Sequence, residues 1–241
     1  MAGRIFIGTS GWNYDAWRGP FYEGRPAKEW LRFCGARFTA IEVNATFYRL
    51  QSAATFRRWR DETPASFRFA VKAHRYLTHN RKLREPLPAI RIERERAAGL
   101  GAKLAAVLWQ LPRNFHRDLE RLQAFAGALR RWPVRHAIEF RHASWFDDGV
   151  AACLREHAIA VCQSDAADWP LWDLVTTDVV YVRLHGHDVT YASPYSVAEL
   201  RAWARKLRRW ADEGRDVHVY FDNDAGGHAP LDALQLIALS S

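Results

Sequence analysis

Short apolar runs alternate along this chain with stretches of helical periodicity. The runs, several of which alternate apolar and polar residues, predict eight β-strands at 4–9, 39–44, 67–73, 104–111, 135–141, 159–165, 179–186 and 217–223. Apolar residues spaced three and four apart predict helices at 27–36, 52–60, 89–98, 118–132, 147–157, 196–213 and 230–239. The link at 166–177 lacks this spacing, so we expect the sixth helix to be irregular or missing.

Eight strands that alternate with helices favour a closed parallel barrel over an open doubly wound sheet. The chain has 241 residues, of which 49% are hydrophobic, and barrels of this size commonly form one domain. We therefore expect residues 1–241 to form a single-domain TIM-type (β/α)8 barrel.

The side on which each strand residue points identifies candidate functional residues. Outward side chains meet the helix layer and are expected to be apolar, whereas inward ones at the carboxyl ends of the strands line the mouth of the barrel. Ile41 and Val43 take the outward side of one strand, which leaves Glu42 and Asn44 inward. By the same rule the other inward positions are Lys72, Gln110, Glu139, Arg141, Arg183, His185, Tyr220 and Asp222. Ser10, Asp165 and Asn223 also lie at strand ends and join the candidates.

An inward polar cluster predicts a site for a small anionic or polyhydroxylated ligand of the sugar, phosphate or nucleotide type. Glu42 and Glu139 are the candidate acid and base, with Lys72 or His185 as a proton partner. The candidate ligand-binding residues are Ser10, Asn44, Gln110, Arg141, Asp165, Arg183, Tyr220, Asp222 and Asn223, with Trp12 and Trp145 beyond two strand ends. In the alternative interpretation, arginines and Lys72 neutralise the two glutamates in an internally paired structural network.

A divalent metal is a second chemical alternative, as in a metal-dependent isomerase or hydrolase of this fold. Glu42, Glu139, Asp165 and His185 are oxygen and nitrogen ligands of a suitable kind. No pair has a local ligand spacing such as His-Glu-x-x-His, and the neighbouring cationic side chains oppose a metal. We therefore assign no metal ligands, and the sequence leaves the cofactor unknown.

Charge and composition add a third alternative, which is a non-catalytic nucleic-acid binding protein. The formal net charge is +8, and one predicted helix carries Arg201, Arg205, Lys206, Arg208 and Arg209. A solvated helix face explains these residues equally well, and nucleic-acid binding leaves the inward cluster unused, so it is not favoured. The chain contains no apolar run of about 18 residues, and we expect a cytoplasmic protein without a membrane partner. Its three dispersed cysteines are typical of reduced, packed thiols.

Several short motifs at the predicted strand ends carry a family resemblance. They are Gly8-Thr9-Ser10-Gly11-Trp12, Glu42-Val43-Asn44, Thr46-Phe47-Tyr48, Phe69-Ala70-Val71-Lys72-Ala73, Thr78-His79, Gln110-Leu111-Pro112, Glu139-Phe140-Arg141-His142, Ser144-Trp145, residues 181–186 and Tyr220-Phe221-Asp222-Asn223. In this order they resemble the YecE-like family, also called domain of unknown function 72, over almost the whole chain. The resemblance implies a TIM-type barrel and no particular activity. Asp222 departs from the family pattern, which often has asparagine there.

Overall fold

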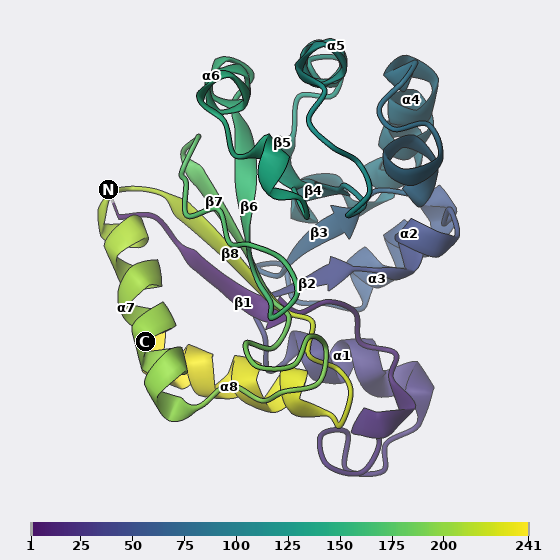
Figure 1. The fold of residues 1–241 in the computed structure, drawn as a ribbon. Helices are drawn as coiled ribbons and strands as arrows, with labels where there is room; N and C mark the ends of the chain where they lie inside the picture. Colours follow the sequence, from purple (N-terminus) through teal and green to yellow (C-terminus); the bar gives the residue numbers. More distant parts are fainter. Residues whose placement is uncertain (1, 241) are drawn as a thin grey trace.

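The computed structural model describes residues 2–240, and eight parallel strands form its centre (Figure 1). The strands are β1 (Ile5–Thr9), β2 (Ala40–Val43), β3 (Arg68–Lys72), β4 (Leu104–Gln110), β5 (Arg135–Glu139), β6 (Ile159–Asp165), β7 (Val179–Leu184) and β8 (Asp216–Phe221). They pair in sequence order, with β1 beside β8. Most observed strands end one or two residues before their predicted ends, so several candidate residues lie just beyond the hydrogen-bonded ladder, at the barrel mouth.

The barrel closes where β1 meets β2. A bridge joins Ser10 to Glu42, and the backbone N–H of Gly11 donates to the carbonyl oxygen of Glu42 at 2.8 Å. A Cβ atom on Gly8 would lie 1.8 Å from the carbonyl oxygen of Ala40. Glycine at position 8 therefore allows the two strands to approach closely, and the predicted (β/α)8 barrel is confirmed.

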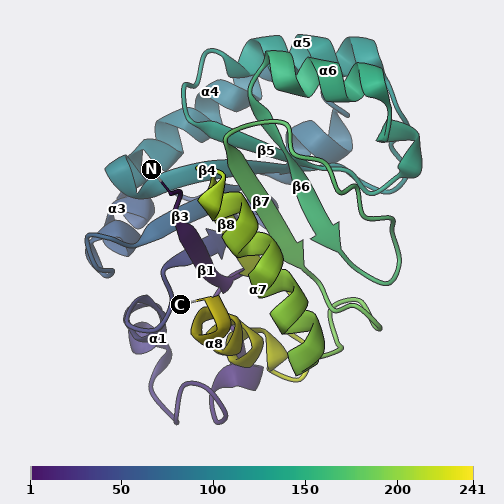
Figure 2. The same ribbon diagram turned by 90° about the vertical axis from the view of Figure 1, so that its left-hand side faces the viewer.

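Helices cover the outside of the barrel. They are α1 (Trp30–Gly35), α2 (Ala45–Tyr48), α3 (Ala53–Asp61), α4 (Pro86–Ala97), α5 (Leu119–Leu129), α6 (Asp148–Glu156), α7 (Val197–Asp212) and α8 (His228–Ser240). Helices α4, α5 and α6 lie on one side of the barrel, and α1, α7 and α8 lie on the other (Figure 1). The α7 and α8 helices run next to each other (Figure 2). No helix forms between β6 and β7, which confirms the expectation for this link.

Side-chain size divides the core into two layers. The barrel interior holds mostly small residues, including Ala40, Ala70 and Ala106, with Leu108 and Tyr181 among them. Larger apolar side chains on the opposite faces of the strands pack against the helices. The polar residues at the carboxyl ends of the strands lie at the mouth, above this apolar filling. Within residues 2–240 no helix is long and apolar enough to cross a membrane.

Candidate functional site

The side chain of Arg183 on β7 is fully buried and holds three carboxylates. Its Nε donates to Glu42 Oε2 at 3.1 Å and its Nη2 donates to Glu42 Oε1 at 2.9 Å. Its Nη1 donates to Glu139 Oε2 at 2.8 Å, and Nη2 also donates to Asp222 Oδ2 at 2.7 Å. Charge-assisted bonds of this kind are short and strong. We call Arg183, Glu42, Glu139 and Asp222 the arginine network.

Both glutamates of the arginine network have further partners. The hydroxyls of Ser10 and Tyr181 donate to Glu42 at 2.8 Å and 2.6 Å, and Arg141 Nε donates to Glu139 Oε1 at 2.7 Å. Burial alone would raise the pKa of Glu139, but the charges of Arg141 and Arg183 lower it well below its usual range. Glu42 and Glu139 are fully buried, so the geometry does not support them as acid and base. Their contacts fit the alternative interpretation, in which arginines neutralise the two glutamates in a structural network.

His185 is also buried within this network. Its Nε2 lies 3.1 Å from Arg183 Nη1 and its Nδ1 lies 3.0 Å from Asp222 Oδ2. A guanidinium nitrogen can only donate, so Nε2 accepts and the proton sits on Nδ1, facing Asp222. Burial, followed by the charge of Arg183, lowers the pKa of His185. His185 is therefore a neutral ring that faces Asp222, and its role as proton partner to a ligand stays a prediction.

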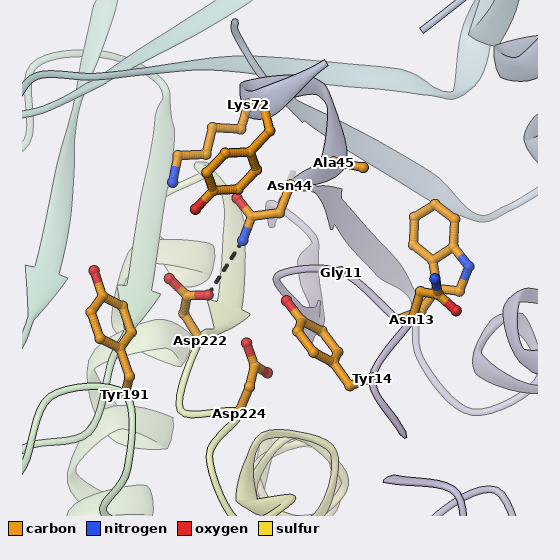
Figure 3. Close-up of a pocket in the computed structure, with 11 residues that line it drawn as sticks. Gly11, Asn13, Tyr14, Asn44, Ala45, Lys72, Tyr191, Asp222 and Asp224 are labelled. Carbon is orange, nitrogen blue, oxygen red and sulfur yellow. Dashed lines mark hydrogen bonds between the residues drawn. The ribbon is translucent and has the colours of Figure 1, made fainter. Parts of the chain in front are cut away.

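A pocket of about 500 Å³ lies above the arginine network, with Asp222 shared between them. Figure 3 shows Tyr14, Asn44, Tyr191, Asp222 and Asp224 arranged around the same space. The residues that line it are Gly11, Trp12, Asn13, Tyr14, Asn44, Ala45, Tyr48, Lys72, Tyr191, Asp222 and Asp224. Binding pockets for small molecules commonly have volumes of roughly 300–1,000 Å³. This pocket is the candidate functional site.

Lys72 supplies the amine of the pocket. Its side chain is only 6% exposed, and its Nζ lies 4.4 Å from the ring centroid of Phe47. Among residues 2–240 no carboxylate lies within ion-pair distance of this nitrogen and no hydrogen bond to it is formed. Burial, followed by the charge of Arg183, lowers the pKa of Lys72 to about 8. About a tenth of the amine is therefore unprotonated at pH 7, far more than for a lysine with the usual pKa of about 10.4.

Two carboxyl groups of opposite character face Lys72 across the pocket. Burial would raise the pKa of Asp222, but Arg183 lowers it far below its usual range, so this group is ionised. Burial, followed by the charge of Asp222, raises the pKa of Asp224 well above its usual range. Asn44 Nδ2 donates to Asp222 Oδ1 at 3.3 Å (Figure 3). The pocket thus presents a carboxylate and a carboxylic acid side by side, an arrangement suited to acid–base chemistry.

The structure places four other candidates outside the pocket. Trp145 is fully buried in the outer layer, where its Nε1 donates to the carbonyl oxygen of Phe115 at 2.6 Å, so the predicted ligand contact is corrected. Asn223 is also fully buried, and its Nδ2 donates to Asp232 Oδ2 at 2.8 Å and to the carbonyl oxygen of Ser193 at 3.0 Å. Tyr220 lies in the barrel interior beneath the network. Gln110 bonds the adjacent backbone through Nε2.

Asp165 faces the helix layer, because the inward positions of β6 belong to its neighbours in the sequence. It accepts from the hydroxyl of Tyr195 at 2.9 Å and lies 3.0 Å from Nδ1 of His187. Its predicted place among the ligand-binding residues is therefore corrected. Trp12 does line the pocket, and its ring packs edge-on against Trp59 at 5.1 Å.

Sequence reasoning did not select Tyr14, Tyr48, Tyr191 and Asp224, which also line the pocket. All four lie in loops that follow strand ends, and this position is the only feature of the sequence that could have indicated them as pocket residues. Strand parity does not extend into loops, so it could not show which loop residues turn toward the mouth.

The residues present do not fit a metal centre. Among residues 2–240 no group of three His, Cys, Asp or Glu side chains is arranged to hold an ion. The guanidinium of Arg183 occupies the space between Glu42, Glu139 and Asp222 that a cation would need. The positive charge at the centre of these carboxylates is therefore part of the chain itself.

The basic residues of α7 are partly committed to contacts within the protein. Lys206 pairs with Asp173 at 2.8 Å and donates to Gln163, and Arg209 lies 3.8 Å from Glu213. Arg208 donates to the carbonyl oxygen of Leu239. This surface does not specifically favour a nucleic-acid partner.

Comparison with known proteins places this barrel in a family. The profile of the family described as "Protein of unknown function DUF72" matches residues 6–241. The UPF0759 protein YunF of Bacillus subtilis is 26% identical over 98% of this chain and 94% of its own length. The UPF0759 protein YecE of Escherichia coli K12 is 27% identical over 60% of this chain and 51% of its own length.

Solved structures agree with this relationship. The crystal structure of a DUF72 family protein from Thermotoga maritima MSB8 superposes with a TM-score of 0.88 at 26% identity and covers 98% of both chains. D-Psicose 3-epimerase from Clostridium cellulolyticum H10, solved with D-tagatose, has a TM-score of 0.57 at 9% identity and covers 100% of this chain and 98% of its own. The second likeness shows the fold alone. The chain belongs to the DUF72 family.

Proposed function

We propose that the pocket binds a small, neutral, polyhydroxylated molecule of the sugar or polyol type. The observation that carries this proposal is the close grouping of an amine, a carboxylate and a carboxylic acid, from Lys72, Asp222 and Asp224, on one pocket of about 500 Å³. A hydroxyl group both donates and accepts hydrogen bonds. A ligand with several adjacent hydroxyls can therefore form hydrogen bonds with both the donor and the acceptor groups of Lys72, Asp222 and Asp224.

Charge distinguishes this ligand class from the anionic ligands that the sequence also allowed. Two carboxyl groups line the pocket, and the ionised one would repel a phosphate or carboxylate. Arg183 and Arg141 do not offset this repulsion, because they are committed to the carboxylates of Glu42, Glu139 and Asp222. A cationic ligand would in turn meet Lys72. A neutral ligand avoids both costs.

The aromatic side chains of the pocket suit the carbon faces of such a ligand. Tyr48 is 70% exposed and Tyr191 is 40% exposed, and Trp12 and Tyr14 also line the pocket. Pockets for small molecules typically combine aromatic walls with a few polar groups that fix orientation. Two acceptors of lining residues, Asn44 Oδ1 and Asp224 Oδ1, have no hydrogen-bond partner within residues 2–240. Hydroxyl donors would satisfy such groups.

Titration calorimetry and thermal-shift measurements test this proposal with xylitol, sorbitol, D-xylose, D-fructose and inorganic phosphate. We expect at least one polyol or sugar to bind and to raise the melting temperature, and phosphate to do neither. Asp224→Ala should weaken that binding, whereas Asp61→Ala, at an exposed position outside the pocket, should leave it unchanged. Binding of phosphate alone, or equal loss in both variants, would overturn the proposal.

A further inference from the structure

We propose that Lys72 acts as a nucleophile and forms an imine with the carbonyl carbon of an open-chain hydroxyaldehyde or hydroxyketone bound in this pocket. This inference rests on the proposed function, because it assumes that polyhydroxylated molecules enter the pocket. It goes further by naming the carbonyl-bearing members of that class as substrates and by assigning a covalent role to one residue.

The surroundings of Lys72 differ from those of the other lysines. The chain contains five lysines, at positions 28, 72, 82, 103 and 206. Lys103 donates to the carbonyl oxygens of Arg60 and Thr63, and Lys206 pairs with Asp173. Lys72 alone combines a buried stem with an Nζ atom that faces the pocket, and Figure 3 shows this nitrogen directed into the open space.

The amine of Lys72 is kept reactive by its setting. A protonated amine cannot attack a carbonyl carbon, and burial together with Arg183 lowers the pKa of this amine to about 8. The ring of Phe47 lies 4.4 Å from Nζ and holds the side chain in place. It stabilises the ammonium form less than a paired carboxylate would.

The neighbouring carboxyl groups complete the reaction. The lone pair of Lys72 Nζ attacks the carbonyl carbon, and a proton moves from nitrogen to the former carbonyl oxygen, which gives a neutral carbinolamine. Asp224, held in its acid form, donates a proton to the carbinolamine hydroxyl, and the C–O bond breaks to release water. The products are an iminium ion on Lys72 and the carboxylate of Asp224. The ionised Asp222 then stabilises the positive iminium.

Reductive trapping tests this inference. The full chain is incubated at pH 7 with D-glyceraldehyde and sodium cyanoborohydride, and peptide mapping by mass spectrometry locates the secondary amine that forms. We expect Lys72 to be labelled on the order of a hundredfold faster than Lys82, because the lowered pKa of Lys72 leaves more of its amine unprotonated at this pH. Lys72→Met and Lys72→Arg should abolish the fast phase, and Lys82→Met should retain it.

A carbonyl-free ligand separates this inference from the proposed function. Xylitol has the hydroxyls but cannot form an imine. If xylitol binds and competes with labelling at Lys72, both proposals are supported. If xylitol or another polyol binds but Lys72 is labelled no faster than Lys82, the covalent role is overturned and the binding function stands. If no polyol or sugar binds and Lys72 is not labelled, both are overturned.

Discussion

Nη2 of Arg183 lies 2.7 Å from Oδ2 of Asp222, and this bond joins the barrel interior to the floor of the pocket. The same guanidinium holds Glu42 from β2 and Glu139 from β5, so one buried cation links strands from different sides of the barrel. Asp222 therefore belongs both to a structural network and to the surface that a ligand would meet. Arg183, which lies beneath the pocket, lowers the pKa of Asp222 and so keeps the pocket floor negatively charged.

Removal of the central cation should destabilise the fold. Arg183→Met would leave the carboxylates of Glu42 and Glu139 buried without their main partner. Breaking a buried ion pair in this way typically costs about 3–5 kcal/mol. Urea unfolding at pH 7 measures the loss in the free energy of unfolding. Arg201→Met, at an exposed position of α7, is the control and should change this free energy by less than about 0.5 kcal/mol.

Removal of the pocket amine should have the opposite effect. The pKa of Lys72 is about 8 in the folded protein, below its ordinary value of 10.5, so the charged form is less favourable folded than unfolded. Lys72→Met should therefore raise the free energy of unfolding by roughly 3 kcal/mol at pH 7. Urea unfolding of the two proteins at the same pH provides the measurement, and a destabilised variant would contradict the expectation.

The lowered pKa of Lys72 also makes the free energy of unfolding depend on pH. Between pH 8 and pH 10.5 the unfolded chain binds more protons at Lys72 than the folded chain does, so the contribution of Lys72 to stability rises with pH across this window. We expect the advantage of Lys72→Met to be greatest below pH 8 and to shrink as the pH approaches 10.5. Unfolding curves at several pH values compare the variant with the wild type, and a difference that is constant with pH would count against a depressed lysine pKa.

Neutralising Asp222 should lower the pKa of Lys72. The carboxylate of Asp222 raises the pKa of Lys72 by stabilising the ammonium form. Asp222→Asn removes that attraction, so the midpoint of lysine titration should move to lower pH. NMR of the protein after reductive ¹³C-methylation of its lysines follows this titration, with the Lys103 resonance as an internal reference. A midpoint that stays in place or moves upward would refute the coupling.

The sequence predicted the barrel well because strand and helix periodicity are local properties. The alternation that put Glu42, Lys72, Glu139 and Arg183 inward also correctly separated them from apolar neighbours such as Val43. The alternation of inward and outward strand positions does not reveal which inward side chains pair with one another. It could therefore not show that Arg183 forms ion pairs with both glutamates and leaves neither free to bind a ligand. It likewise says nothing about residues beyond the strand ends.

Loop residues show this limit most clearly. Asn223 and Trp145 follow strands just as Trp12 does, yet they turn into the outer layer and bond Asp232 and the backbone of Phe115. Asp224, one residue beyond Asn223, lines the pocket instead. These directions depend on turn geometry and on contacts with distant segments. Only the three-dimensional structure supplies them.

Gly8 provides a test of barrel closure that is independent of the pocket. A Cβ atom at this position would lie 1.8 Å from the carbonyl oxygen and 2.8 Å from the carbonyl carbon of Ala40, both on β2. Backbone atoms of a paired strand cannot rotate aside as a side chain can. Gly8→Ala must therefore push β1 away from β2, where the bridge between Ser10 and Glu42 closes the barrel.

We expect Gly8→Ala to cost more than the about 1–3 kcal/mol typical of an overpacked core. Gly127→Ala is the matched control, because Gly127 is exposed within α5 and a Cβ atom there would meet no atom within 4 Å. That substitution should instead stabilise the protein by about 0.5–1 kcal/mol through helix propensity. Urea unfolding of both variants gives the comparison. If Gly8→Ala were as stable as the wild type, close contact between β1 and β2 would not be what requires glycine here.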